Sequence, residues 1–152
     1  MTEVLFYHLQ RRTLEQVLPP LLAKCLERGW RVVVQAASAE RVAALDAHLW
    51  TYDDESFLPH GPAGDRDAAD QPILLTTAPT NPNGASVRFL VDGAELDDPA
   101  AYAPYARAVF LFDGNDDEAV ASARGRWTAL KAAGHEVTYW RQDEAGRWER
   151  KG

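Results

Sequence analysis

Short apolar runs that alternate with helical patterns constrain the fold of this chain more than any other feature. Val32–Val34, Ile73–Leu75 and Val109–Leu111 are unbroken by polar residues, which is typical of parallel strands buried on both faces. Parallel neighbours need a long crossover between them, usually a helix. We therefore predict an α/β domain in three layers, with a mainly parallel sheet, helices on both of its faces and these three runs at its centre.

The order of the expected elements supports this architecture. Strands are predicted at residues 3–9, 30–35, 72–77, 87–92, 108–112 and 136–141, and Trp148 could pair as a further edge strand. Helices are predicted from Thr13 to about Arg28, from Ser38 past Leu49, near Pro99 and from Asn115 to Ala133. Pro19 and Pro20 lack amide donors, so the first helix either starts there or kinks. By length, residues 1–152 fit a single domain.

The distribution of charge along the chain disfavours direct binding to nucleic acid. The net charge is -7, and residues 40–123 carry 16 acidic but only 4 basic side chains. No basic stripe follows the chain, so any contact with DNA is expected to be indirect. The sequence shows no signal peptide and no apolar run long enough to cross a membrane, and its single Cys25 excludes an internal disulfide. We expect a soluble cytoplasmic protein with no membrane partner.

The stretch Leu45–Gly61, LDAHLWTYDDESFLPHG, combines large apolar side chains with carboxylates. Trp50, Phe57, Leu58 and Pro59 lie in or beside an irregular run, although an aromatic side chain of this size buries about 150–250 Å² when packed. These side chains could pack on the chain's own core, on a ligand or on another protein. Exposed apolar patches on soluble proteins usually mark a binding site, and we favour another protein.

The acidic run Asp113–Glu118 follows an expected strand and opens an expected helix. Open α/β sheets bind ligands at the carboxyl ends of their strands. Asp113, Asp116 and Asp117 could therefore hold Mg²⁺ in a small phosphotransferase or hydrolase, which is our alternative hypothesis. The simpler interpretation is a helix cap, in which Asn115 or Asp116 accepts the first amide protons.

The motifs that such an enzyme would need are missing from the sequence. There is no GxxxxGK[ST], and no GxGxxG follows the first strand. His60 lies beside acids without an HxxxH or HExxH spacing, and Ser56 has no GxSxG frame. We therefore expect no catalytic residue, no bound metal and no cofactor.

The helix expected from residue 115 carries a second candidate surface. At 100° per residue, Val120, Arg124, Trp127 and Lys131 lie within about 60° of one another. They could form a solvated flank with Trp127 half-buried, or a small apolar notch with cationic walls. The notch would suit an acidic peptide with a C-terminal apolar residue, because an arginine can hold a carboxylate through two hydrogen bonds.

Seven segments of the chain resemble the chi subunit family of bacterial DNA polymerase III holoenzyme. They are VLFYHL, LERGWRVVV, LDAHLWTYDDESFLPHG, QPILLTT, FLVDGAE, the pattern AR-x-RW-xxx-KAAG, and EVTYW. The LW…ESFLPHG segment is the most specific, and the match spans nearly the full length. The resemblance implies a Rossmann-like sheet without nucleotide motifs. It also implies an accessory subunit of the clamp loader in DNA replication, which is no enzyme on its own. The holoenzyme to which it would belong is a DNA-directed DNA polymerase, and thus a nucleotidyltransferase.

The resemblance implies the psi subunit of the clamp loader as one partner. The residues that match the family's psi-facing region are Trp50, Phe57, Leu58 and Pro59. These are the apolar side chains that the sequence already assigns to a protein partner.

The resemblance implies the acidic, Phe-terminated tail of single-stranded DNA-binding protein as a second partner. The tail-binding residues are expected on the helix of residues 115–133, at Val120, Arg124, Trp127, Thr128 and Lys131. Thr128 stands where the family has Lys, and Trp127 where it has Tyr. This helix therefore offers the tail one cation fewer.

Overall fold

The computed structural model describes residues 2–10, 12–51, 60–62, 71–96, 98–145 and 147–151, which contain both strands and helices. The strands are β1 (Glu3–Leu9), β2 (Val32–Gln35), β3 (His60–Pro62), β4 (Ile73–Thr76), β5 (Val87–Val91), β6 (Arg107–Asp113), β7 (Glu136–Gln142) and β8 (Trp148–Arg150). The helices are α1 (Leu14–Glu27), α2 (Ala39–Thr51), the short 3-10 helix η2 (Pro99–Tyr102) and α3 (Asp117–Ala132). The expected elements are thus all present, and β3 was missed.

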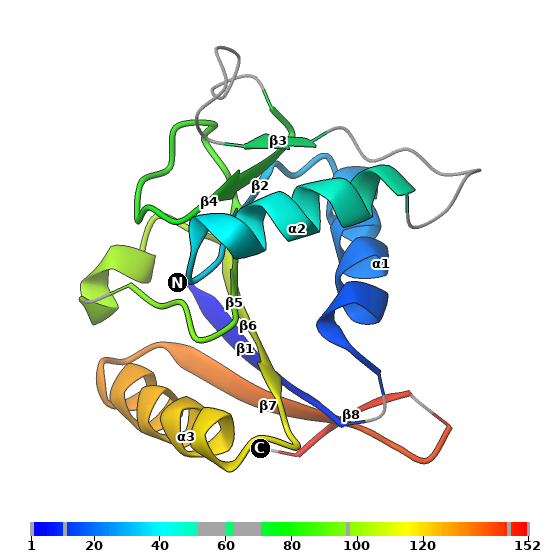
Figure 1. Ribbon diagram of the computed structural model, residues 1–152. Coiled ribbons are helices and arrows are strands. Elements are labelled where there is room, and N and C mark those ends of the chain that lie inside the picture. The colour runs from blue at the N-terminus through cyan, green and yellow to red at the C-terminus, as the bar shows by residue number, and fades with distance from the viewer. Residues whose placement is uncertain are drawn as a thin grey trace.

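These strands form one sheet in the order β3-β4-β2-β5-β6-β1-β7-β8. Neighbours are parallel throughout, except that β8 pairs antiparallel with β7. Figure 1 shows α1 and α2 on one side of the sheet and α3 on the other. The predicted three-layer, mainly parallel α/β architecture is therefore confirmed, and Trp148 begins the edge strand as expected.

One expected position in the sheet is wrong. The runs in β2 and β6 flank β5 in the interior, but β4, which contains Ile73–Leu75, lies second from the edge. Its side chains are nonetheless buried on both faces. An apolar run therefore indicates that both faces of a strand are covered by other elements. It does not indicate that the strand lies at the centre of the sheet. The outer neighbour β3 is a three-residue strand, HGP, with no apolar pattern that could have predicted it.

Helix α1 begins before its two prolines rather than at them. The side chain of Thr13 accepts a hydrogen bond from the Gln16 amide, and the Gln16 side chain accepts one from the Thr13 amide. This reciprocal capping box satisfies two amides that a helix start leaves free. The helix then runs from Leu14 through Pro19 and Pro20, so of the two alternatives the later start is wrong.

A neighbouring helix satisfies a carbonyl that proline leaves without its helical partner. Pro19 has no N–H, so it cannot donate to the carbonyl of Glu15 one turn earlier. The imidazole Nε2 of His48, in α2, lies 2.6 Å from that carbonyl oxygen. A carbonyl only accepts, so Nε2 is the donor and this bond fastens α2 to α1.

The two faces of the sheet carry separate apolar cores. Beneath α1 and α2 the core includes Leu5, Leu22, Val34, Leu45 and Phe89, among others. Beneath α3 it includes Val4, Phe6, Phe110, Ala123 and Leu130, among others. Among the described residues, no helix is long and apolar enough to span a membrane.

Candidate functional site

The start of α3 is fixed by one of the two residues that the sequence proposed as caps. The Asp116 side chain accepts hydrogen bonds from the amides of Glu118 and Ala119, at 3.0 and 3.4 Å. Asp117 and Glu118 add negative charge in the first turn, where the helix dipole favours it. Asp116, not Asn115, is therefore the cap.

The side of α3 that packs on the sheet is narrow. Ala123 and Leu130 are buried against the sheet, with 2% and 3% of their surfaces exposed. Ala119 is only half-buried and Ala133, just past the helix, is exposed. The close contact between α3 and the sheet is thus confined to Ala123 and Leu130, and the alanines at the two ends of the helix take no part in it.

Val120 and Trp127 lie on the edge between the buried and exposed sides of α3. Both are half-buried and pack against the core of this face. The indole Nε1 of Trp127 is buried and has no hydrogen-bond partner among the described residues. Trp127 is therefore half-buried, as the simpler interpretation expected.

The polar residues of the candidate tail-binding surface are exposed. Arg124, Thr128 and Lys131 all reach solvent. The ammonium group of Lys131 lies 4.5 Å from the centroid of the Trp127 ring, a cation–π contact that holds the lysine over the indole. The hydroxyl of Thr128 donates to the backbone carbonyl of Arg124 at 3.0 Å, so it turns back toward the helix.

A cation that the sequence analysis did not select lies beside this surface. Arg141 is two residues from Tyr139 on β7, and side chains at this spacing share one face of a sheet. Tyr139 packs against the core beneath α3, so Arg141 belongs to the same side. Within the described part of the chain, neither Arg141 nor Arg124 forms an ion pair. No described carboxylate therefore neutralises either guanidinium group.

The charges of Arg124 and Arg141 both influence the pKa values of His8 and Tyr139. Burial lowers the pKa of His8, and the positive charges of Arg141 and Arg124 lower it further. Burial raises the pKa of Tyr139, and the same two guanidinium groups oppose that rise. Arg124 from α3 and Arg141 from β7 therefore both lie close enough to this pair of rings to act on it.

His8 is fixed in place from two sides. Its Nδ1 lies 2.5 Å from the Tyr139 hydroxyl, and its Nε2 has no partner among the described residues. A Cβ added at Gly114 would come within 2.0 Å of Nε2. The turn after β6 therefore needs glycine at this position, because any side chain would displace the His8 ring and with it Tyr139.

Lowering the pH is expected to destabilise the protein through His8. The unfolded chain binds this proton with a pKa of about 6.5, whereas folded His8 has a lowered pKa. The unfolded state thus binds more protons below about pH 6.5, and the free energy of unfolding falls. We expect the His8→Phe variant to lose less stability between about pH 7.5 and about pH 5.5 than the unchanged protein. Urea denaturation at both pH values measures this; equal losses would show that folded His8 takes up its proton as readily as unfolded His8.

The predicted psi-facing stretch lies mostly outside the described residues. Trp50 belongs to α2, but only its backbone is described, and Phe57, Leu58 and Pro59 fall within residues 52–59, which are not described. The expectation that these four side chains meet a partner therefore stays a prediction.

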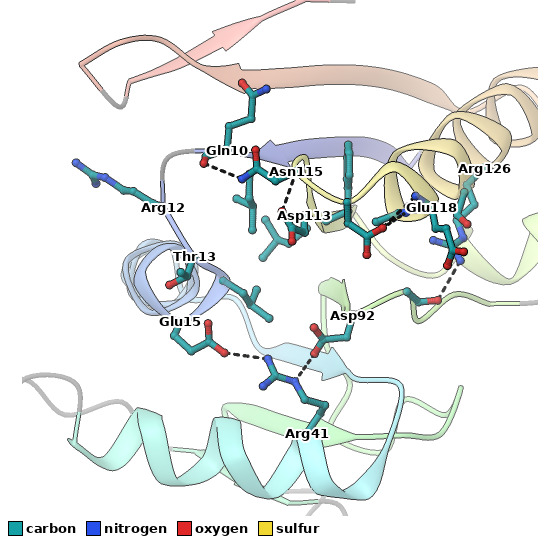
Figure 2. Close-up of a pocket in the computed structure, with 18 residues that line it drawn as sticks. Gln10, Arg12, Thr13, Glu15, Arg41, Asp92, Asp113, Asn115, Glu118 and Arg126 are labelled. Carbon is teal, nitrogen blue, oxygen red and sulfur yellow. Dashed lines mark hydrogen bonds and ion pairs between the residues drawn. The ribbon is translucent and has the colours of Figure 1, made fainter.

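A cleft of about 680 Å³ opens at the carboxyl ends of β1, β5 and β6 (Figure 2). There β1 leads into α1 on one face and β6 leads into α3 on the other, the arrangement at which open α/β sheets commonly bind ligands. Arg41 of α2 reaches toward both Glu15 and Asp92, with N–O distances of 3.0 and 2.7 Å (Figure 2). This bridge ties α1, α2 and the end of β5 together at the cleft.

Asp113 and Asp116, two acidic residues of this cleft, accept hydrogen bonds that stabilise a turn and the start of α3. Asp113 accepts from the Asn115 amide at 2.9 Å, and the Asn115 side chain donates to the Gln10 carbonyl at 3.0 Å. These bonds tie the turn after β6 to the turn after β1, and Asp116 caps α3. Among the described residues, no group of three His, Cys, Asp or Glu side chains is placed to hold a metal ion. The Mg²⁺ alternative therefore gains no support from these side chains.

Comparisons with known proteins identify relatives of this chain. A family model described as DNA polymerase III chi subunit, HolC, matches residues 1–138. A protein named probable DNA polymerase III subunit chi, from Rickettsia prowazekii (strain Madrid E), is 29% identical over 96 residues, which is 63% of this chain. The aligned segment spans 58% of that relative's length.

Proposed function

Because the chain belongs to the DNA polymerase III chi subunit family, we propose that it is a non-catalytic accessory subunit of the clamp-loader complex in DNA replication. In this role it links the psi subunit to the C-terminal tail of single-stranded DNA-binding protein. It meets DNA only through these partners, in the cytoplasm, and needs no cofactor. The observation that supports the tail-binding part is that Arg124 and Arg141, which form no ion pair with a described residue, both act on His8 and Tyr139, while Trp127 on the same helix as Arg124 is half-buried.

The chemistry of an acidic, Phe-terminated tail complements this surface. The terminal ring packs between Val120 and Trp127, where burying an aromatic side chain gives most of the binding energy. The terminal carboxylate and a neighbouring aspartate pair with Arg124 and Arg141, whose charges no described carboxylate neutralises. Arg141 thereby replaces the cation that the helix lacks at Thr128.

Removing the terminal Phe from a tail peptide is expected to weaken its binding by about tenfold or more, because both the ring and the position of the carboxylate are lost. Fluorescence anisotropy of a labelled acidic peptide, with and without its Phe, measures the two dissociation constants. Binding should also weaken as salt is raised, because the two arginines lie near the surface.

A matched control keeps the charge of the peptide and changes its apolar end. A peptide with the terminal Phe replaced by Gly carries the same carboxylates, so it retains the long-range attraction but not the ring. If both peptides bind alike at every salt concentration, only general attraction between opposite charges operates, and the tail does not use a specific site.

Phe57→Ala is expected to weaken a complex with the psi partner by more than about 2 kcal/mol, as removal of a buried aromatic anchor does. This expectation rests on the family resemblance and on the composition of Leu45–Gly61. Co-expression with psi followed by titration calorimetry measures the loss, and thermal unfolding checks the fold. A large fall in melting temperature with unchanged psi binding would instead place Phe57 in the core.

A further inference from the structure

A second cavity, of about 210 Å³, lies on the sheet face opposite α3, toward the amino ends of β5 and β6. Aliphatic and aromatic side chains from α1, β1, β5 and β6 make its floor: Leu5, Leu21, Val87, Phe89 and Val109. Its walls are three aromatic rings, those of Tyr7, Trp30 and Trp148. We call this cavity the Trp30 pocket.

The aromatic walls of the Trp30 pocket are held by defined contacts. The rings of Tyr7 and Trp148 meet edge to face, with centroids 4.6 Å apart. Trp30 is half-buried, and the guanidinium carbons of Arg28 and Arg107 lie 5.1 and 5.2 Å from its ring centroid. The strand β8 thus provides one wall, and the chain between α1 and β2 provides another.

The rim of the Trp30 pocket is cationic. Lys24, Arg28 and Arg107 line it, and no Asp or Glu does. Lys24 and Arg28 are exposed and form no ion pair with any residue that the structure describes. Arg107 is 3.6 Å from the carboxylate of Glu3, with both side chains partly exposed, so this pair neutralises only one charge. The pocket therefore combines an apolar interior with at least two free positive charges.

We propose that the Trp30 pocket binds an acidic peptide segment of a partner protein, with one apolar side chain, aromatic or aliphatic, as its anchor. The anchor enters the pocket, and flanking carboxylates pair with Lys24 and Arg28. The volume is below the roughly 300–1,000 Å³ typical of pockets for whole small ligands, so it suits one side chain. The pocket lies on the sheet face opposite the α3 surface, so the protein can hold two acidic segments at once.

The polarity of the pocket favours an apolar anchor over a nucleobase. A base inserted among Leu5, Val109 and Phe89 would bury donors and acceptors without partners, which is costly. A Phe or Leu side chain carries no such groups. A single-stranded nucleic acid would also need a groove of cations along its backbone, whereas the acidic middle of this chain opposes one.

The test uses the full chain with the α3 surface disabled by Arg124→Ala and Arg141→Ala. The probe is a labelled ten-residue peptide with six Asp, three Gly and one C-terminal Phe. We expect this variant to bind the peptide about a hundredfold more weakly than the unchanged protein but still measurably, through the Trp30 pocket. Addition of Lys24→Glu and Arg28→Glu should weaken this remaining binding by tenfold or more. Arg12→Glu and Arg147→Glu are the matched control for charge, because both arginines are exposed and neither lines the pocket; they should change binding far less. Indole resonances of Trp30 and Trp148 should shift when the peptide is added.

Four results would overturn the proposal. The first is equal binding with and without Lys24→Glu and Arg28→Glu. The second is equal binding of a peptide in which Gly replaces the Phe, which would leave only general charge attraction. The third is tighter binding of a thymidine oligonucleotide than of the peptide. The fourth is loss of all peptide binding in the Arg124→Ala, Arg141→Ala variant, which would support the α3 site instead. Peptide binding that these two substitutions leave unchanged would count against the α3 site alone.

Discussion

Replacing Arg124 and Arg141 together by Ala is expected to weaken binding of an acidic, Phe-terminated tail peptide by about a hundredfold. Each charge-assisted hydrogen bond contributes roughly 1.5–3 kcal/mol, and about 1.4 kcal/mol corresponds to tenfold in the dissociation constant. Arg124 alone should account for about tenfold of this loss. The two residues come from α3 and β7 and act on the same His8–Tyr139 pair, so their effects are expected to depend on each other.

The control for this double variant removes two other arginines. Arg12 and Arg147 are exposed, and Arg147 already pairs with Asp143, so their replacement by Ala changes the net charge equally without touching α3. A loss of similar size in the control would mean that net charge, not a site, determines binding. Thr128→Lys restores a cation on the outer face of α3 and should strengthen binding by about threefold, the scale of one exposed ion pair.

The positions of the helices and strands could be predicted because they depend on interactions between residues close together in the sequence. Thr13, Asp116 and the apolar run of β2 each act within a few residues, through a cap or through burial. Thr13 and the run of β2 were predicted where they occur, and Asp116 was one of two candidate caps. The order of strands depends on which runs pair across long distances. The sequence therefore could not show that β4 lies near an edge or that HGP adds the short strand β3 outside it.

The candidate site was predictable where it lies on one helix and not where two elements meet. Helical spacing alone placed Val120, Arg124 and Trp127 together. Arg141 was missed because its relation to Arg124 depends on how α3 crosses β7. The one available signal was the alternation in EVTYWR, which puts Tyr139 and Arg141 on the same face of a strand.

Replacing Arg88 by Met is expected to lower the free energy of unfolding by about 3–5 kcal/mol, as loss of one member of a buried polar network does. Arg88 lies on the α3 side of β5, where its guanidinium group reaches backbone carbonyls of the chain between β4 and β5. Arg88 is fully buried. It donates to the Gln35 side chain, to the carbonyls of Ala78 and Thr80, and to the Tyr105 hydroxyl.

Methionine at position 88 fills similar space but leaves each of these acceptors unpaired, so the loss is much larger than that of an exposed arginine. Urea denaturation of the variant measures it. Arg12→Met, at an exposed position, should change stability by no more than about 0.5 kcal/mol, and Tyr105→Phe should cost about 1 kcal/mol because it removes one of the bonds. A loss below about 1 kcal/mol for Arg88→Met would mean that water replaces the guanidinium at the carbonyls. Arg88 would then not be what holds the chain between β4 and β5 against the sheet.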